Sequence, residues 1–430
     1  MEKKKLLVLG SDYGTLAIVQ QAHKMGLYVV VADYLPTTPT KEAADEAWTI
    51  STPDIDALEK KCREQKIDAV ITGASDFNIN NSRKLCKRLG LPYYAASDHA
   101  WETANNKAMF KETCKEVGAP IATDYILSDA LSDEELAPIV YPVVVKPVDK
   151  SGNKGMNYCN NRKELIDAYK YARTVSDNAR IIVERQFHGP EFVANYVLAN
   201  GEARLLYLSK EHHEPGQKAN LYSVINTTSR HLKQFREELN EKVKEVFKKI
   251  GCRDGIAWVE CMLDDDGHFY LIEMGYRFAG EMTYTAYKYV NGFDSIKWMI
   301  EIALGIKHTE KDLPAELDKA YTSIAASYLI FTNKGTTIGV LEGKEKIMEM
   351  PNVMVDIPRK VGNEVRPFAT MGVFRIFGEC AEAVCETIKK INDAFVVKDE
   401  SGNDLIIKFD DYDAIINDFN DGLAEFGIER

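Results

Sequence analysis

The sequence predicts a mixed protein in which an α/β domain comes first and an α+β region follows. Over residues 5–100, short apolar strands alternate with amphipathic helices, the pattern of an open parallel sheet with right-handed crossovers. Over residues 256–274, two apolar runs flank the turn Asp264-Asp265-Asp266-Gly267, the pattern of an antiparallel hairpin. A chain of 430 residues has room for two or three such domains.

The composition indicates which classes of binding partner are disfavoured. The formal net charge is −12 and the isoelectric point is near 5.3, which argues against nucleic acid or an anionic membrane as a partner. No apolar run approaches the ~18 residues that a membrane-spanning helix needs, and the short run after Lys5 indicates a first strand and not a signal peptide. None of the eight cysteines forms a CxxC pair, and the histidines lack metal-ligand spacing. We therefore expect a cytoplasmic protein.

The N-terminal elements are expected in alternation. The strands are Lys5–Gly10, Leu27–Asp33 and Asp68–Thr72, and the helices are Gly14–Gly26, Ile55–Gln65 and Asn78–Leu89. The first turn, from Gly10 to Gly14, lacks the third glycine of the dinucleotide-binding fingerprint, although Asp33 stands about where a ribose-binding acid would be. A sheet edge that helps to bind a substrate is therefore favoured over a dinucleotide site.

The predicted hairpin carries one carboxylate in each apolar strand. Alternation places Glu260 on one face with Trp258, and Glu273 lies inside the second strand. Two unpaired carboxylates on adjacent strands repel each other and are costly to bury, whereas Mg²⁺ binds carboxylate oxygens readily. The alternative is an edge hairpin whose acids face solvent. Arg277 and Glu281 follow Glu273 in steps of four, so a cation and a second acid come just after the predicted metal pair.

Two lysines precede the hairpin in distinctive contexts. Lys107 lies in the first turn of the helix expected over Asn105–Gly118, where a solvated lysine is the ordinary alternative. Lys146 interrupts the apolar strand Pro142–Pro147, where a lysine usually needs a fixed anionic partner. The next loop, Asp149–Gly155, can turn backbone N–H groups toward phosphate oxygens, although surface loops of this composition are common. It does not match GxxxxGK[ST], so a P-loop is excluded.

Two apolar strands over Arg180–Ala199 are joined by the linker Glu184–Glu191. Such a linker can offer backbone groups to an adenine edge and Glu191 to ribose hydroxyls, and a plain hairpin turn with solvated charges is the alternative. The later elements are expected as helices over Asn240–Ile250, Thr283–Gly305 and Ala381–Ile391, and as strands over Tyr321–Phe331, Gly372–Phe377 and Asp404–Phe409.

In this order, the features resemble the ATP-grasp superfamily. The resemblance covers residues 1–310, and the remainder resembles the closing region of biotin-carboxylase-like members. It implies an ATP-grasp fold in four parts: a Rossmann-like pre-ATP-grasp α/β domain over 1–102, an N-terminal ATP-grasp part with a mobile lid over 103–187, a C-terminal ATP-grasp part with the metal site over 188–315, and the closing region over 316–430.

The resemblance also implies roles for individual residues. It assigns ATP phosphates to Lys107 and Lys146, the lid to Ser151, Gly152 and Gly155, adenine to Glu184, Arg185 and Phe187, ribose to Glu191, and Mg²⁺ (with Mn²⁺ as a substitute) to Glu260 and Glu273. Arg277 would hold the acceptor carboxylate or stabilise charge on the transferring phosphoryl group, and Glu281 resembles the acid of bicarbonate chemistry in biotin carboxylase. One departure is Gly275, where the superfamily usually has an asparagine, so a ligand of a second Mg²⁺ is missing or replaced.

The activity implied by the resemblance is that of an ATP- and Mg²⁺-dependent ligase. Such an enzyme joins a small carboxylate to an amine or thiol through an acyl phosphate and releases ADP and phosphate. Three alternatives stay open: a bicarbonate-activating enzyme resembling carbamoyl-phosphate synthase or biotin carboxylase, a ligase resembling phosphoribosylglycinamide synthetase, and a non-catalytic ATP-binding regulatory protein. A homodimer is consistent with the resemblance, which implies neither nucleic acid nor a membrane as a partner.

Overall fold

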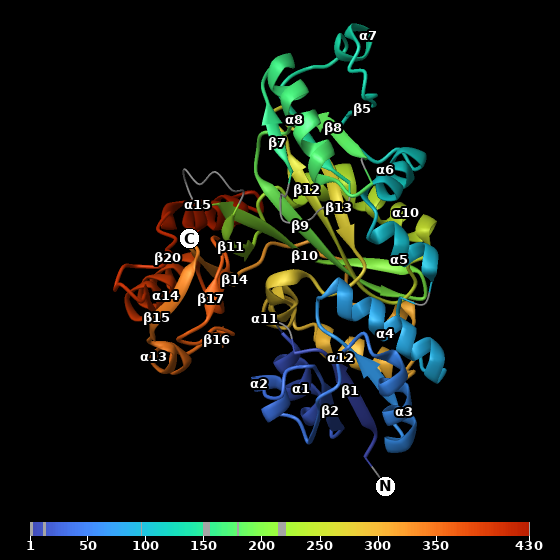
Figure 1. Cartoon of the computed structure of the whole chain (residues 1–430), viewed down its shortest axis with the longest axis vertical. Coiled ribbons are helices and arrows are strands. Elements are labelled where there is room, and N and C mark those ends of the chain that lie inside the picture. The colour runs from blue at the N-terminus through green and yellow to red at the C-terminus, as the bar shows by residue number, and fades with distance from the viewer. Residues whose placement is uncertain are drawn as a thin grey trace.

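Figure 1 shows the computed structural model of the chain, which describes residues 3–11, 14–95, 97–148, 155–178, 180–213 and 221–429. Ser151 and Gly152 of the predicted lid, and the side chain of Glu281, lie outside the described part. Among the described residues, no helix is long and apolar enough to cross a membrane. All eight cysteines are free thiols.

The N-terminal region is an open parallel sheet, as the alternating pattern predicted. Its strands are β1 (Lys5–Leu9), β2 (Tyr28–Ala32), β3 (Glu46–Trp48) and β4 (Ala69–Ile71), in the order β3-β2-β1-β4. Its helices are α1 (Thr15–Lys24), α2 (Pro39–Glu42), α3 (Ile55–Gln65) and α4 (Asp76–Leu89). Successive residues of β1 face opposite sides, so Leu6 and Val8 pack toward α1 while Leu7 and Leu9 pack toward α3 and α4. Both faces are covered, which explains the continuous apolar runs.

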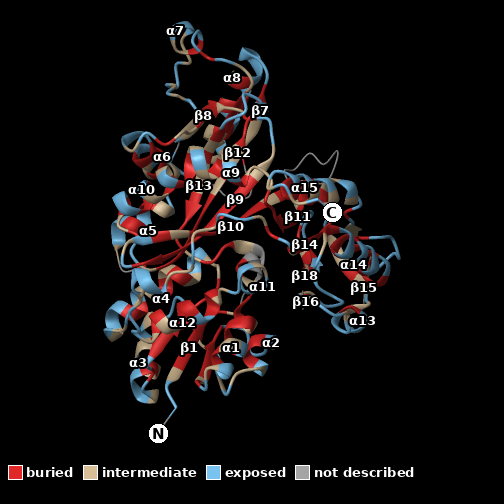
Figure 2. Cartoon of the chain, turned by 180° about the vertical axis from the view of Figure 1, so that it is seen from behind, coloured by how far each residue is buried: buried red, intermediate tan, exposed pale blue. Residues whose placement is uncertain are grey.

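A nine-stranded antiparallel sheet forms the middle of the molecule (Figure 1). It runs β13-β12-β9-β10-β11-β14-β18-β16, and β20 pairs with β14. The strands are β9 (Glu191–Ala199), β10 (Glu202–His213), β11 (Tyr222–Thr227), β12 (Gly255–Leu263), β13 (Phe269–Gly275), β14 (Ile324–Thr332), β16 (Val353–Asp356), β18 (Thr370–Gly378) and β20 (Ile406–Ile407). The strands of this sheet are among the most deeply buried parts of the chain (Figure 2).

The two faces of the central sheet differ in chemistry. On one face, alternate residues of β9 and β12 such as Phe192 and Val259 pack in a single apolar core with the covering helices. These helices are α5 (Asp98–Ala104), α6 (Lys107–Glu116), α9 (Leu232–Phe235), a π-helical segment (Arg236–Asn240) and α10 (Glu241–Ile250). On the other face lie Trp258 and Glu260, whose partners across β9 are Asn195 and Val193. The polar groups of the predicted site are therefore kept on the face away from this core.

A β-bulge between β12 and β13 brings the two predicted metal acids together. Glu260 pairs with Glu273, but Cys261 pairs with Leu271, so Ile272 is an extra residue on β13. Strict alternation would put Glu273 on the face of Leu271, which belongs to the apolar core. The bulge turns Glu273 to the face of Glu260 instead.

A small antiparallel sheet lies at the end of the molecule opposite the N-terminal domain (Figure 1). Its order is β5-β8-β6-β7, with β5 (Asp124–Tyr125), β6 (Val143–Pro147), β7 (Asn157–Cys159) and β8 (Ile181–Arg185), and it is accompanied by α7 (Asp133–Leu136) and α8 (Arg162–Val175). Val143 and Val145 share a buried cluster with Leu165 and Ala172 of α8. Because residues alternate along β6, Lys146 lies on the face turned away from that cluster.

The C-terminal region extends the central sheet and adds a second, smaller one. Strands β15 (Thr336–Glu342), β17 (Glu364–Val365) and β19 (Val396–Asp399) form a three-stranded sheet, and the helices are α13 (Lys344–Met348), α14 (Ala381–Ala394) and α15 (Tyr412–Ala424). Because β14, β16, β18 and β20 belong to the central sheet, that sheet takes strands from both 188–315 and 316–430.

Two predicted elements are corrected. The single helix expected over Thr283–Gly305 is instead a 3₁₀ segment (Gly280–Thr285), α11 (Ala286–Asn291) and α12 (Ser295–Ala303). Gly292, at φ 77°, ends α11, and the Asp294 side chain accepts from the Lys297 N–H to begin α12. The closing strand expected over Asp404–Phe409 is limited to the two residues of β20.

Tyr276, directly after β13, ties the hairpin to its surroundings. Its side chain is 1% exposed, and its hydroxyl donates to the carbonyl of Asp254 at 2.7 Å and accepts from the N–H of Arg253 at 3.2 Å. The same oxygen lies 3.3 Å from the carbonyl oxygen of Tyr94, in the segment between α4 and α5. One hydroxyl thus links the end of β13 to the start of β12 and to the segment before α5.

We predict that Tyr276→Phe lowers the free energy of unfolding by about 1–3 kcal/mol, because it removes hydrogen bonds to partly buried backbone groups. Urea denaturation followed by circular dichroism measures this change. Tyr171→Phe, at a side chain that is 53% exposed, is the matched control and should leave the midpoint unchanged. Equal midpoints for Tyr276→Phe and the control would contradict the anchoring role.

Candidate active site

Helix α6 presents two lysines to the centre of the molecule. The helix begins at Lys107 because the Asn106 side chain accepts from the N–H groups of Ala108 and Met109. Lys107 and Lys111 are four residues apart and therefore share one helix face. Lys107 forms an ion pair with Glu273 of the hairpin.

Glu184 of β8 is the centre of a buried charge network. Its carboxylate is ion-paired to Lys146 of β6 and to Lys111, which also pairs with Asp124. Burial by itself disfavours the charged carboxylate, but the ammonium groups of Lys146 and Lys111 outweigh it and lower the pKa of Glu184 to about 2. Glu184 is 7% exposed and Lys111 is 6% exposed, so both charges depend on each other for compensation.

Of the three lysines near this carboxylate, Lys146 alone has a lowered pKa. Burial disfavours the charged form of Lys111, but Glu184 and Asp124 outweigh it and raise its pKa. Burial lowers the pKa of Lys146, and the positive charges of Lys107 and Lys111 lower it further against the attraction of Glu184. Burial also disfavours the charged form of Lys107, but Glu273 and Glu260 outweigh it, so the pKa of Lys107 is raised. Lys146 is therefore the ammonium group with the most to gain from an additional anion.

Glu260 and Glu273 are direct partners across the hairpin and both act electrostatically on Lys107. Two opposed carboxylates supply the hard oxygen ligands that Mg²⁺ prefers, and Lys107 supplies positive charge at the same place. The donor set therefore fits one divalent cation. Next to it stand the lysines of α6 and β6, which suit the phosphates that commonly complete a Mg²⁺ shell.

Arg277 lies just beyond the acid pair and is held from two sides. Its Nε donates to Asp76 Oδ1 at 2.5 Å and its second terminal nitrogen to Asp76 Oδ2 at 3.2 Å, which connects it to the first residue of α4. It also donates to the carbonyl of Phe278 at 2.8 Å, and its guanidinium lies 5.0 Å from the ring centroid of Trp258. Arg277, the residue predicted to hold the acceptor carboxylate, thus lies where the N-terminal domain meets the hairpin.

The linker predicted to hold adenine is organised by the hairpin turn. The Arg185 side chain is ion-paired with Asp264, and the same carboxylate accepts the N–H of His188 at 2.9 Å. The Phe187 ring stacks on Tyr270 with 4.6 Å between centroids. The Glu184 side chain, in contrast, is ion-paired with Lys146 and Lys111. Only the backbone of Glu184 is therefore left to contact adenine.

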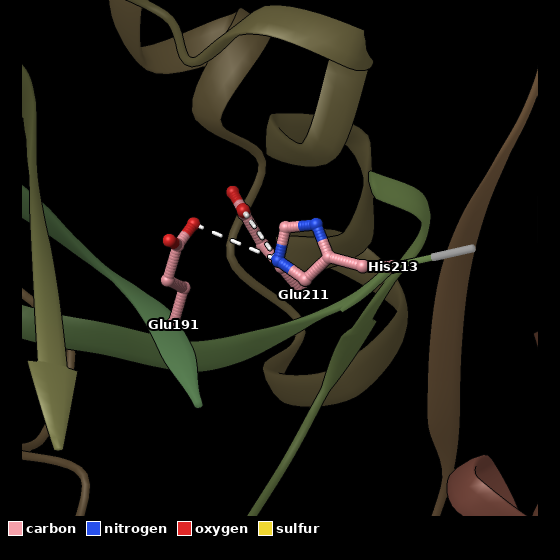
Figure 3. Close-up of side chains that lie close together, drawn as sticks. All are labelled: Glu191, Glu211 and His213. Atoms are coloured by element: carbon pink, nitrogen blue, oxygen red, sulfur yellow. Dashed lines mark ion pairs between the residues drawn. The ribbon is translucent and has the colours of Figure 1, made fainter. Parts of the chain in front are cut away.

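Glu191, predicted to bind ribose, belongs to a three-residue cluster on the same central sheet (Figure 3). His213 Nε2 lies 3.7 Å from Glu191 Oε2 and 4.0 Å from Glu211 Oε2. Their ligand atoms all lie within 4.8 Å of one another, so the cluster could hold a metal ion.

The structure connects four of the predicted residues in one set of charges and adds a fifth. Lys107, Lys146, Glu184 and Glu273 lie in one connected set of charges, and Lys111, which was not predicted, completes it. No local signal distinguished Lys111 from Lys107, because both lie on the same face of α6.

Gly155, the one predicted lid residue in the described part, has φ 82°, and a Cβ there would lie 2.8 Å from Pro147 Cγ. Glycine is therefore required at that turn by both backbone conformation and space.

Comparison with known proteins identifies this arrangement. Residues 106–311 match the sequence family described as the carbamoyl-phosphate synthase L chain, ATP binding domain. The fold and the site define an ATP-grasp protein. Residues 106–311 are therefore an ATP-binding domain of the carbamoyl-phosphate synthase type, and the chain as a whole has the fold of ATP-grasp proteins.

Relatives and solved structures agree on the fold. The chain is 24% identical over 328 residues to the 2-oxoglutarate carboxylase small subunit of Hydrogenobacter thermophilus, covering 72% of this chain and 69% of that one. It is 26% identical over 300 residues to the methylcrotonoyl-CoA carboxylase subunit alpha of Dictyostelium discoideum, of which the match spans only 41%.

Two solved structures superpose on nearly the whole chain. The L-amino acid ligase of Bacillus licheniformis has a TM-score of 0.74 at 20% identity and covers 93% of this chain and 99% of that one. The biotin carboxylase domain of the Hydrogenobacter thermophilus 2-oxoglutarate carboxylase, solved as a dimer with MgADP, ADP and bicarbonate, has a TM-score of 0.74 at 20% identity, with coverages of 100% and 96%.

We predict that the ion pairs of Glu184 with Lys146 and Lys111 make the free energy of unfolding depend on pH. Because the pKa of Glu184 is lowered from 4.5 to about 2 in the folded protein, its stabilisation is present above about pH 4.5 and is lost as the pH falls toward 2. The midpoint of urea unfolding should therefore decrease over this range.

Glu184→Gln should lower the midpoint at pH 7 and flatten its decrease between pH 4.5 and 2, because the carboxylate that titrates there is gone. Glu134→Gln, at an exposed carboxylate of α7, is the control and should behave as the unchanged protein does. An acid dependence in Glu184→Gln equal to that of the control would contradict the network.

Proposed function

We propose that this protein is an ATP-dependent, ADP-forming ligase that activates a small carboxylate as an acyl phosphate and transfers it to an amine or thiol. The observation that carries the proposal is the convergence of three lysines, two from α6 and one from β6 of the small sheet, toward the Glu260–Glu273 pair of the central sheet. Such a site supplies what phosphoryl transfer needs from a protein, namely positioning and charge neutralisation.

The residues take roles that follow from their contacts. Lys146 and Lys107 bind ATP phosphates, and Lys111 keeps Glu184 charged and in place behind Lys146. Glu260 and Glu273 hold Mg²⁺, which when bound neutralises phosphate charge, and Mn²⁺ substitutes for it. The linker from Arg185 to Phe187, fixed against the hairpin turn, bounds the adenine. Glu191 binds the ribose.

Arg277 holds the acceptor beside the phosphates. Its guanidinium is oriented by Asp76 and Trp258, so an anionic acceptor meets a cation whose position is already set. The acceptor carboxylate then attacks the γ-phosphorus, ADP leaves, and the nucleophile displaces phosphate from the acyl phosphate. The lid is assigned to Ser151, Gly152 and Gly155. Glu281 is assigned to the acceptor.

A second candidate is bicarbonate activation. It is supported by the match of the ATP-binding domain to the carbamoyl-phosphate synthase type and by a relative named as a carboxylase. In that reaction bicarbonate replaces the carboxylate, and carboxyphosphate replaces the acyl phosphate.

The proposal further includes the four-part division at residues 102, 187 and 315, a homodimer, and a cytoplasmic location.

We predict ADP and phosphate release from Mg-ATP when the correct acceptor is present. The assay pools amino acids, dicarboxylates and bicarbonate separately, each with and without amines. Stimulation by an organic carboxylate pool supports the ligase, and stimulation by bicarbonate alone supports the second candidate. ATP binding without stimulation by any pool would contradict both and favour a regulatory protein.

Lys146→Met should reduce the stimulated rate by at least about 100-fold, the scale for losing one group that stabilises developing charge. Lys163→Met removes an exposed lysine from α8 in the same region, and it should retain the original rate.

We predict that Glu273→Gln raises the Mg²⁺ concentration required for half-maximal ADP release by at least about tenfold, the range seen when even the partner of a metal ligand is lost. Titration of Mg²⁺ at fixed ATP measures this. Glu134→Gln serves again as the control. An unchanged Mg²⁺ requirement in Glu273→Gln would show that the metal is held elsewhere.

A further inference from the structure

The indole of Trp258 carries a buried donor without a partner. Trp258 is 6% exposed, and its Nε1 makes no hydrogen bond with the described residues. Buried N–H groups in native proteins are nearly always bonded, and one that is not bonded costs free energy. An acceptor that reached Trp258 Nε1 would remove this cost.

Its position connects the donor to the candidate active site. Trp258 and Glu260 lie two residues apart on the same face of β12, and their partners on β13 are Gly275 and Glu273. The Trp258–Gly275 pair is therefore the next cross-strand pair on this face after the Glu260–Glu273 pair.

Gly275 lets the indole adopt this position. A Cβ at Gly275 would lie 2.3 Å from Trp258 Cε2, 2.4 Å from Cζ2 and 2.6 Å from Nε1. The N–H edge of the ring thus occupies the space into which a side chain at position 275 would project. Residue 275 faces the same side as Glu273, so the donor is on the side of the metal-binding carboxylates.

A cation stands at the same place. The Arg277 guanidinium contacts the Trp258 ring at 5.0 Å from its centroid and is fixed by Asp76 and by the carbonyl of Phe278. A guanidinium has five N–H donors, and these bonds use three of them. A neutral N–H donor and a positively charged donor beside two metal-binding acids form a site suited to an oxyanion.

We propose that Trp258 is a further ligand-binding residue, whose indole N–H donates a hydrogen bond to an oxyanion held between the Glu260–Glu273 pair and Arg277. The inference rests on the proposed function. Two sources have this chemistry: the γ-phosphoryl group of ATP and the carboxylate or bicarbonate of the acceptor. In either case the indole occupies the space that a side chain at position 275 would need.

The test is the indole N–H resonance of Trp258 in ¹⁵N-labelled whole protein. The chain has four tryptophans, and Trp→Phe variants assign their signals. Two of them are internal references: Trp48 Nε1 donates to Glu46 Oε1 at 2.7 Å, and Trp298 Nε1 is buried without a partner among the described residues. The Trp258 signal should lie near that of an unbonded indole in the free protein.

Three additions separate the two sources. A downfield shift of the Trp258 signal with Mg and a non-hydrolysable ATP analogue, but not with MgADP, supports the γ-phosphoryl group. A shift with MgADP plus bicarbonate, or with MgADP plus an acceptor that stimulates ADP release, supports the acceptor. No shift in any mixture, while calorimetry shows that nucleotide binds, overturns the inference and leaves the proposed function intact. Absence of nucleotide binding overturns the proposed function itself.

Kinetics provide a second measurement. Trp258→Phe keeps an aromatic ring under Arg277 and removes only the donor, so the half-saturating concentration of the oxyanion source should rise about tenfold while that of the other substrate changes little. Trp298→Phe removes a buried indole N–H from α12 and should change neither half-saturating concentration. Unchanged half-saturation in Trp258→Phe, with its melting temperature retained, would overturn the inference.

Discussion

The carboxylate of Glu184, enclosed by the ammonium groups of Lys146 and Lys111, is the interaction on which the site depends. Each of these charges is costly to bury alone, and together they hold α6, β6 and β8 in one geometry. The ion pair of Lys107 with Glu273 extends the same set of charges to the hairpin of the central sheet. These ion pairs thereby join the small sheet and the central sheet through α6.

The central sheet separates packing from chemistry. One face, covered by α5, α6 and α10, is apolar, and the other carries the acid pair and Trp258. The N-terminal domain packs against this second face, where Val197 and Ile256 share an apolar cluster with residues of β1. Arg277 illustrates the arrangement, because its orientation depends on Asp76 of α4.

Much of this architecture follows from local pattern. Alternating strands and helices predicted the parallel N-terminal sheet, and the apolar runs about an aspartate-rich turn predicted the β12–β13 hairpin. The apolar context of Lys146 correctly indicated a fixed anionic partner. Pattern alone failed at Lys111, because an amphipathic helix with several lysines does not reveal which of them is buried. It also missed the break at Gly292, since apolar periodicity continues on both sides of it.

The sequence by itself determined the class of protein: the order of lysines, linker and acids is specific enough to identify an ATP-grasp chain, because each residue type serves a fixed chemical need. Only the tertiary structure decided how these groups meet. Alternation assigns Glu273 to the wrong face, and the bulge at Ile272, whose register is set by pairing with β12, brings it beside Glu260. Likewise Glu184 is a linker acid in sequence and a buried counter-ion in space, because its partners lie 38 and 73 residues away. Such long-range pairings are decided by the packing of whole sheets, which no local pattern contains.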